Sequence, residues 1–181
     1  VYSPGELVKT NVDGTINVVR AATDAGVGRV LVVSSDKAVE ATNLYGMTKA
    51  VAEAYAVQSN SYSAPRGTRV SVVRYGNVLG SRGSVVLTWR DQARAGLPLT
   101  VTDARMTRFV ITIGQAVRFV FDALRDMEGG EVFVPRLPAA RIGDLLAAAR
   151  TAWRAAGAEE EVRVTGLRPG GEKINESLLS S

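Results

Sequence analysis

The chain contains neither cysteine nor histidine. Without cysteine it forms no disulfide and offers no thiolate nucleophile or sulfur ligand, which fits a reducing compartment. Without histidine it has no Ser-His-Asp triad, no histidine general base and none of the usual zinc-ligand sets. No metal site is therefore predicted, and acid-base chemistry is left to tyrosine, lysine, aspartate and glutamate.

Long apolar runs are also missing, and Val1 does not begin a charged segment followed by an apolar core. We therefore expect no transmembrane helix, no signal peptide and no membrane partner, and we predict a cytoplasmic location. Aromatic residues make up only 6% of the chain, and its arginines are scattered among acids. The formal net charge of +4 thus favours a small phosphate-bearing partner and no nucleic acid.

Hydrophobic periodicity predicts helices that alternate with short β-branched strands. This alternation implies a parallel sheet covered by helices, and therefore an α/β fold. A polar linker is expected over 60–68 and a loop over 76–83. The helices are predicted over 6–25, 45–59, 84–95, 113–125 with Thr112 as cap, and 142–155; the strands are predicted over 29–34, 69–75, 99–101, 107–111, 131–134 and 162–167.

One motif is absent from the whole sequence. No Gly-x-Gly-x-x-Gly follows a strand, so the unit that cradles the phosphates of a dinucleotide is missing. We therefore expect the chain to start in the middle of a larger enzyme.

The most informative residues lie between the strand at 29–34 and the helix that follows it. The strand delivers Ser35, Asp36 and Lys37 to its carboxyl end, and Tyr45 and Lys49 share one face of the helix. An amine held there is expected to lower the pKa of Tyr45 toward a value useful for proton transfer. Taken alone, the same residues also fit a solvated helix end and an ordinary loop ion pair.

Several ordered motifs narrow these alternatives. They are Ser35-Asp36-Lys37-Ala38-Val39, Thr42-Asn43-Leu44-Tyr45-Gly46, Arg74-Tyr75-Gly76-Asn77-Val78-Leu79-Gly80-Ser81-Arg82-Gly83-Ser84 and Met106-Thr107-Arg108-Phe109. With them, the chain resembles the extended short-chain dehydrogenase/reductase superfamily. Within it, the chain is similar over essentially all its length to the inverting UDP-N-acetylglucosamine 4,6-dehydratases and related capsular polysaccharide biosynthesis proteins.

This resemblance implies a partial Rossmann-type parallel sheet whose N-terminal dinucleotide-binding half is missing, together with a smaller α/β substrate-binding domain. Residues 1–80 would be the C-terminal half of the NAD(P)-binding domain, with the catalytic motif. Residues 81–181 would mainly bind the nucleotide sugar. The implied cofactor is NADP or NAD, the implied substrate is a UDP-sugar, and the full-length enzyme would be a homo-oligomer.

The resemblance also assigns roles to residues. Tyr45 would take the proton of the sugar 4-hydroxyl, and Lys49 would hold the cofactor ribose and the tyrosine. Lys37 would take the C5 proton and Asp36 would protonate the leaving oxygen, while Ser35 would bind the 4-oxygen or orient Tyr45. Asn11 and Tyr75 would join Tyr45 and Lys49 at the cofactor.

Six residues match the nucleotide-sugar contacts of the family: Asn77, Arg82, Val101, Arg108, Arg168 and Glu172. Paired guanidinium donors suit a diphosphate, which Arg108 and Arg168 would flank. The backbone from Leu99 to Thr102 would pass along the uracil, and Glu172 would reach a ribose hydroxyl. Two departures stand out. An additional glycine in Arg168-Pro169-Gly170-Gly171-Glu172 displaces Glu172 relative to Arg168, and Glu40-Ala41 replaces a common Asn-Pro pair.

Three functions stay open at this point. The first is a nucleotide-sugar 4,6-dehydratase, or its catalytic and substrate-binding portion. The second is a UDP-sugar 4-epimerase of the same superfamily, which needs no acid-base pair for elimination, so the Asp36-Lys37 pair disfavours it. The third is a fragment that lacks the cofactor loop and binds a sugar nucleotide without turnover, or is inactive.

Overall fold

The computed structural model describes residues 3–153, 161–167 and 171–179. The chain separates into two compact units. The first comprises Val1–Tyr75, Ala116–Arg136 and Ser177–Ser181, and the second comprises Gly76–Gln115 and Leu137–Glu176. Both units are interrupted in sequence, because the chain returns to the first unit at Ala116 and again at Ser177. The division into two functional domains at residue 80 stays a prediction.

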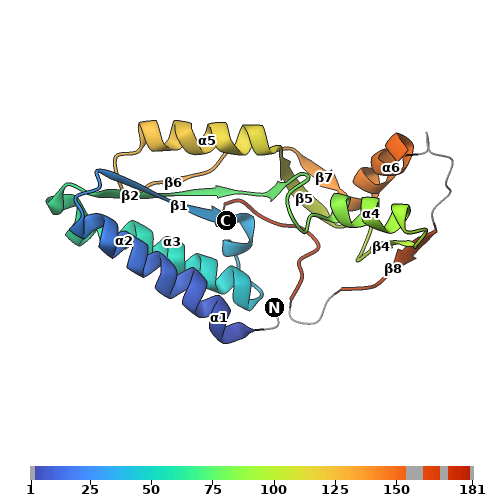
Figure 1. The fold of residues 1–181 in the computed structure, drawn as a ribbon, viewed down its shortest axis with the longest axis horizontal. Coiled ribbons are helices and arrows are strands. Elements are labelled where there is room, and N and C mark those ends of the chain that lie inside the picture. Colours follow the sequence, from blue (N-terminus) through green and yellow to red (C-terminus); the bar gives the residue numbers. More distant parts are fainter. Residues whose placement is uncertain (1–2, 154–160, 168–170, 180–181) are drawn as a thin grey trace. The chain divides into compact units, whose positions relative to one another are not determined.

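The first unit is built on a parallel sheet of three strands. The order is β1 (Arg29–Ser35), β2 (Arg69–Tyr75) and β6 (Val132–Phe133). Helices α2 (Gly14–Asp24) and α3 (Leu44–Ser63) lie on one side of the sheet and α5 (Ile113–Asp126) lies on the other (Figure 1). The predicted α/β class with a parallel sheet is confirmed.

The helices of this unit differ in detail from the prediction. A π-helical turn, Lys9–Asp13, separates α1 (Pro4–Val8) from α2, where one continuous helix was expected. Helix α3 runs on to Ser63, so the predicted linker is mostly helical. Its extension is held by Asn60, whose side-chain amide donates to the Val70 carbonyl at 2.8 Å and accepts from the Val70 amide at 3.0 Å.

The second unit holds two small sheets. Strand β5 (Thr107–Ile111) pairs in parallel with β3 (Asn77–Val78) and antiparallel with β7 (Ala139–Arg141). Strand β4 (Leu99–Val101) pairs in parallel with β8 (Val162–Val164). The core around Trp89, Leu99 and Leu146 joins β4 to helices α4 (Val85–Arg94) and α6 (Ile142–Trp153).

The predicted cap of α5 is confirmed. The Gln115 amide donates to the Thr112 hydroxyl at 3.3 Å, and the Thr112 amide donates to the Gln115 side chain at 2.9 Å, which is a reciprocal capping box. Among the helices that the structure describes, none has the length and apolar character required to cross a bilayer.

Glu131 joins the end of α5 to the sheet. Its carboxylate accepts hydrogen bonds from the Ser71 hydroxyl of β2 and from the amides of Glu128 and Gly129, both at 2.9 Å. Burial raises the pKa of Glu131, but these hydrogen bonds outweigh burial and hold the pKa below its ordinary value. The folded state therefore favours the ionised carboxyl.

We predict that Glu131→Gln lowers the free energy of unfolding at pH 7 by about 1.5–3 kcal/mol, the usual value of hydrogen bonds to a charged group. Because the pKa is lowered by folding, this stabilisation is present above the ordinary glutamate pKa and is lost as the pH falls through the folded value. Urea unfolding at pH 7 and below pH 4 measures both effects. The exposed Glu128→Gln variant is the control, and equal losses at both pH values would contradict the prediction.

Candidate active site

A short 3-10 turn, Asp36–Ala38, follows β1 and carries the predicted acid-base pair. Asp36 is fully buried (0% exposed), whereas the Lys37 side chain is 31% exposed. Lys37 Nζ and the Ser35 hydroxyl both donate to Asp36 Oδ1, at 3.0 and 2.9 Å. The other oxygen, Asp36 Oδ2, accepts no hydrogen bond from any described residue. One face of a buried carboxyl is thus left for a further donor.

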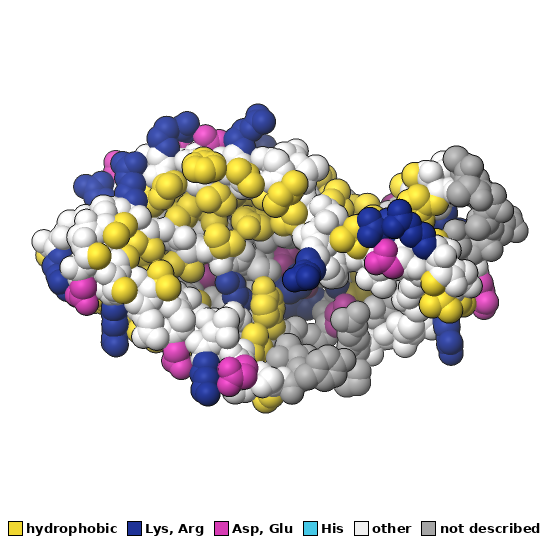
Figure 2. Space-filling model, viewed as in Figure 1, with side chains coloured by type: hydrophobic (Ala, Val, Ile, Leu, Met, Phe, Trp, Pro, Cys, Tyr) yellow, Lys and Arg dark blue, Asp and Glu magenta, His cyan; other side chains and the backbone are white. Residues whose placement is uncertain are grey.

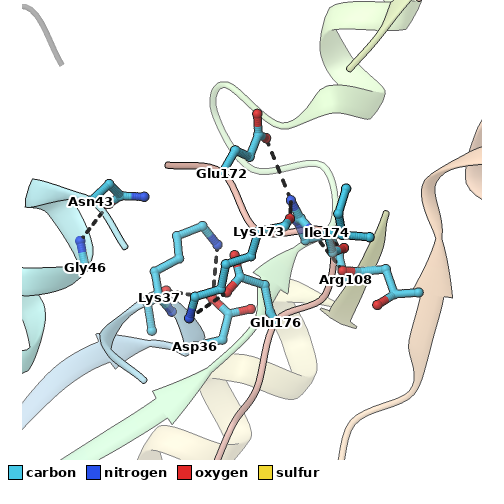
Figure 3. Close-up of polar contacts among 11 residues, drawn as sticks. Asp36, Lys37, Asn43, Gly46, Arg108, Glu172, Lys173, Ile174 and Glu176 are labelled. Carbon is cyan, nitrogen blue, oxygen red and sulfur yellow. Dashed lines mark hydrogen bonds and ion pairs between the residues drawn. The ribbon is translucent and has the colours of Figure 1, made fainter. Parts of the chain in front are cut away.

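The first turn of α3 is fixed against this 3-10 turn. Asn43 caps α3 by accepting a hydrogen bond from the Gly46 amide at 2.9 Å (Figure 3). A Cβ atom at Gly46 would collide with the Lys37 carbonyl oxygen and would also crowd Ala41. Only glycine permits this approach, which sets Tyr45 next to the backbone that carries Asp36 and Lys37.

Tyr45 and Lys49 are both half-buried on α3. Burial raises the pKa of Tyr45, and the Asp36 and Tyr75 side chains raise it further. The expected lowering of this pKa is therefore wrong for the chain alone. Burial also lowers the pKa of Lys49, partly offset by Glu53, and its Nζ donates to the Val33 carbonyl of β1.

Asn11 and Tyr75, predicted at the cofactor, lie in the same unit. Ser35 and Tyr75 are direct partners in the register of β1 and β2, so both lie at the carboxyl ends of adjacent parallel strands. Burial raises the pKa of Tyr75. The Asn11 amide donates to the Thr48 hydroxyl at 3.0 Å. The structure thus brings all seven predicted catalytic and cofactor residues into the first unit.

The second unit contains a cavity of about 340 Å³. Five of the six predicted substrate residues line it: Asn77, Arg82, Val101, Arg108 and Glu172. The sixth, Arg168, lies outside the described residues. Arg82 is exposed and precedes the N-terminus of α4, where Ser84 stands at the N-cap and its hydroxyl has no described partner.

Arg108 is buried and is engaged inside the second unit. Its guanidinium donates to the carbonyls of Thr107, Lys173 and Ile174 at 2.7, 3.0 and 3.1 Å. Glu172 approaches it at 3.7 Å (Figure 3). Arg108 therefore holds the segment that carries Glu172 at the cavity, despite the additional glycine before it.

Three polar residues of the cavity, Ser84, Thr88 and Thr165, were missed from the sequence. Thr100 and Thr102 also line it, and they belong to the stretch 99–102 that was predicted along the uracil. Ser84 had a usable signal, because serine before a predicted helix is typical of an N-cap next to an anion site. Thr165 had none, since it comes from the end of β8, far away in sequence. Within the described residues, no cluster of acidic side chains has the makings of a metal site.

Comparison with known proteins supplies the family. The model of a polysaccharide biosynthesis protein family matches residues 1–181. The chain belongs to this family. It is 39% identical over 181 residues to the UDP-N-acetylglucosamine 4,6-dehydratase (inverting) of Campylobacter jejuni, over 99% of this chain and 52% of that protein. The resemblance stated from the motifs is thus confirmed.

Two further relatives widen the comparison. The chain is 38% identical over 180 residues to the UDP-glucose 4-epimerase of Rickettsia canadensis, over 99% of this chain and 52% of that protein. The X-ray structure of Pen from Bacillus thuringiensis superposes with a TM-score of 0.94 at 36% identity, over 99% of this chain and 55% of that one. The chain spans about half the length of these relatives.

We predict that Gly46→Ala destabilises the first unit, because the new Cβ pushes the Lys37 carbonyl away from α3. The loss in the free energy of unfolding should be about 1–3 kcal/mol, as for other overpacked sites. Gly114→Ala is the matched control: it also lies in the first turn of a helix, and its Cβ would meet nothing within 4 Å. Chemical denaturation compares the two, and equal stability of both variants would contradict the contact.

Proposed function

We propose that the chain supplies the catalytic and sugar-nucleotide-binding residues of a nucleotide-sugar 4,6-dehydratase of the UDP-N-acetylglucosamine type, in surface polysaccharide or modified-sugar biosynthesis. One observation carries the proposal. Lys37 and the fully buried Asp36 lie 3.0 Å apart, beside the helix turn with Tyr45. Oxidation at C4 or epimerisation needs Tyr45 and Lys49 only, whereas elimination of water needs this second acid-base pair.

The roles follow from the chemistry of each group. Tyr45 accepts the proton of the sugar 4-hydroxyl as C4 becomes a ketone, and the ammonium of Lys49 favours the phenolate that this requires. Burial raises the pKa of Tyr45 in the chain alone, so this help from Lys49 is needed. Ser35, at the end of β1, would bind the 4-oxygen by turning its hydroxyl away from Asp36 Oδ1, to which it now donates at 2.9 Å.

The ketone acidifies the proton on C5. Neutral Lys37 takes that proton, and protonated Asp36 gives its own proton to the oxygen on C6, which leaves as water and creates a C5–C6 double bond. Both neutral forms arise when one proton moves along the 3.0 Å contact from Lys37 Nζ to Asp36 Oδ1. Asp36 Oδ2 is buried and receives no hydrogen bond from the described residues. Oδ1 carries the proton received from Lys37, so Oδ1 is the atom that would give this proton to the oxygen on C6.

A nicotinamide dinucleotide, NAD or NADP, would accept the hydride from C4 and return it to C6 when bound. The residues present fit the nicotinamide end of such a group, because Lys49 and Tyr45 are half-buried and Asn11 and Tyr75 lie in the same unit. The sequence offers no Gly-rich turn for the pyrophosphate. We propose that a separate dinucleotide-binding unit provides it.

The exposed edge of the first sheet supports the proposal of a separate dinucleotide-binding unit. β1 is an edge strand in the described sheet, although parallel strands are usually covered on both sides. Val33 on β1 is 42% exposed, and Val117 and Phe121 on α5 are 47% and 65% exposed. Figure 2 shows apolar side chains gathered where α5 and the sheet lie. A further strand and helix would cover this surface.

The cavity of the second unit is proposed to hold the UDP portion. Arg82 and the N-terminus of α4 together offer a cation and free amide donors to the diphosphate. The backbone near Val101 would lie along the uracil, and Glu172 would reach a ribose hydroxyl. Arg108 would act by holding Glu172, because its own donors bind backbone carbonyls. A role for Arg168 remains a prediction.

A 4-epimerase is the second candidate, and the 38% identity to a protein of that name favours it. Incubation of UDP-N-acetylglucosamine with the complete enzyme distinguishes the two. UDP-N-acetylgalactosamine as the sole product would favour the epimerase, and a 4-keto-6-deoxy product would favour the dehydratase. A homo-oligomeric enzyme and a cytoplasmic location remain predictions from resemblance and composition.

We predict that Asp36→Asn combined with Lys37→Met abolishes water loss in a protein that carries this chain together with a dinucleotide-binding unit. The 4-keto-6-deoxy product should fall by about 10²–10⁴-fold, the usual contribution of acid-base groups. Oxidation at C4 should persist and be seen as reduced nicotinamide absorbance. The matched control is Asp24→Asn with Arg66→Met, which removes an exposed ion pair of 2.9 Å. Normal product formation by the Asp36 and Lys37 variant would overturn the assignment.

We also predict that the 181-residue chain binds UDP, and that Arg82→Ala weakens this binding about tenfold through loss of a charge-assisted phosphate contact. Isothermal titration calorimetry measures the dissociation constant. Arg94→Ala, in the last turn of α4 and away from the cavity, should leave it unchanged. A parallel titration with NADP tests the cofactor site, and binding of neither compound would favour an inactive fragment.

A further inference from the structure

We propose that Thr48 is a positioning residue for the Tyr45–Lys49 pair, because its hydroxyl ties the first turn of α3 to the π-helical turn with Asn11. The proposal deepens the proposed function and rests on it. Thr48 lies between the two residues in sequence and is buried. Its hydroxyl is used by hydrogen bonds within the protein. Thr48 would therefore act on the reaction only by fixing the positions of Tyr45 and Lys49.

The Thr48 hydroxyl makes two hydrogen bonds. It donates to the Tyr45 carbonyl at 2.8 Å and accepts from the Asn11 side-chain amide at 3.0 Å. The donor of the second bond belongs to a different helix, 37 residues earlier in the chain. One hydroxyl therefore fixes the backbone of Tyr45 relative to Asn11.

The π-helical turn explains how Asn11 takes part. Within Lys9–Asp13 the Gly14 amide donates to the Lys9 carbonyl, five residues back, so this turn is wider than an α-helical turn. The Thr15 hydroxyl donates to the Asn11 carbonyl at 2.7 Å and supports the widened backbone. π-Turns of this kind are frequent at functional sites. In this turn, the Asn11 side chain makes the contact with Thr48.

An ordinary structural role is the competing explanation. A threonine in a helix commonly donates to a carbonyl of the preceding turn, and this alone positions nothing. Thr23 does so on α2: it is equally buried, and its hydroxyl donates to the Val19 carbonyl at 2.8 Å. No second helix supplies a hydrogen bond to Thr23 among the contacts of the described residues. Thr23 is thus a matched control for Thr48.

The two explanations differ in what they predict for the Tyr45 phenol. Burial raises the pKa of Tyr45, and Asp36 and Tyr75 add to this effect. If Thr48 holds the first turn of α3 in place, its loss lets Tyr45 move outward and its titration shifts toward that of a free tyrosine. Loss of a merely structural hydroxyl leaves this titration unchanged.

The experiment compares Thr48→Val, Thr48→Ser and Thr23→Val in the complete chain. Fluorotyrosine is incorporated at the five tyrosines, because fluorine lowers the phenol pKa into a range where proteins stay folded. The Tyr45 signal is identified by ¹⁹F NMR as the one lost in Tyr45→Phe. We expect Thr48→Val to shift its titration downward by about 0.5 pH unit or more, whereas Thr48→Ser and Thr23→Val keep the parent value.

The proposal would be overturned if the Tyr45 phenol of Thr48→Val titrated as in the parent protein, or if Thr23→Val shifted this titration by the same amount. Should Thr48→Val fail to fold, Asn11→Ala tests the same link, because it removes the side-chain amide that donates to Thr48 while Thr48 itself stays in place, and it should shift the Tyr45 titration in the same direction. None of these readouts requires turnover. An unchanged titration thus refutes the role of Thr48, whereas absence of the 4-keto-6-deoxy product in the complete enzyme refutes the dehydratase.

Discussion

The close contact between Gly46 and the Lys37 carbonyl governs the geometry of the candidate catalytic region. Because no side chain separates them, the first turn of α3 lies directly against the 3-10 turn that follows β1. The two groups of candidate catalytic residues, 35–37 and 45–49, are thereby fixed to each other through backbone rather than through flexible side chains. The Asn43 cap stabilises the same turn, so a local sequence signal and a tertiary contact act together.

Elements with a strong local pattern were predicted well, whereas the short strand β3 lies inside the predicted loop 76–83. Val70, Val72 and Val73 belong to a β-branched run that is buried, and β2 has the predicted bounds. In contrast, the extension of α3 depends on Asn60 binding the backbone of Val70, a tertiary contact that no local pattern reveals. β7 was missed for a similar reason, because Ala139–Arg141 has little strand propensity and forms by pairing with β5.

The candidate site likewise combines features that the sequence predicts with features that depend on tertiary contacts. Spacing pointed to Tyr45 and Lys49, and the family resemblance selected the residues of the cavity. Both groups do gather in their respective units. The direction of the Tyr45 pKa was not predictable, because it depends mainly on how far α3 and its neighbours bury the phenol. The engagement of Arg108 by the carbonyls of Lys173 and Ile174 likewise joins segments about 65 residues apart, beyond the reach of local patterns.

Lys49 shows how far the influences on one catalytic candidate extend. Burial lowers its pKa, and Glu53, one turn further along α3, acts in the opposite direction. Glu53 is itself buried and is held by two hydrogen bonds from Arg74 of β2, and Arg74 Nη1 also donates to the Leu178 carbonyl at 2.8 Å. The carboxylate therefore cannot turn away from Lys49 without breaking contacts to the sheet. Stability of the first unit and the charge state of Lys49, a proposed catalytic residue, consequently depend on the same ion pair.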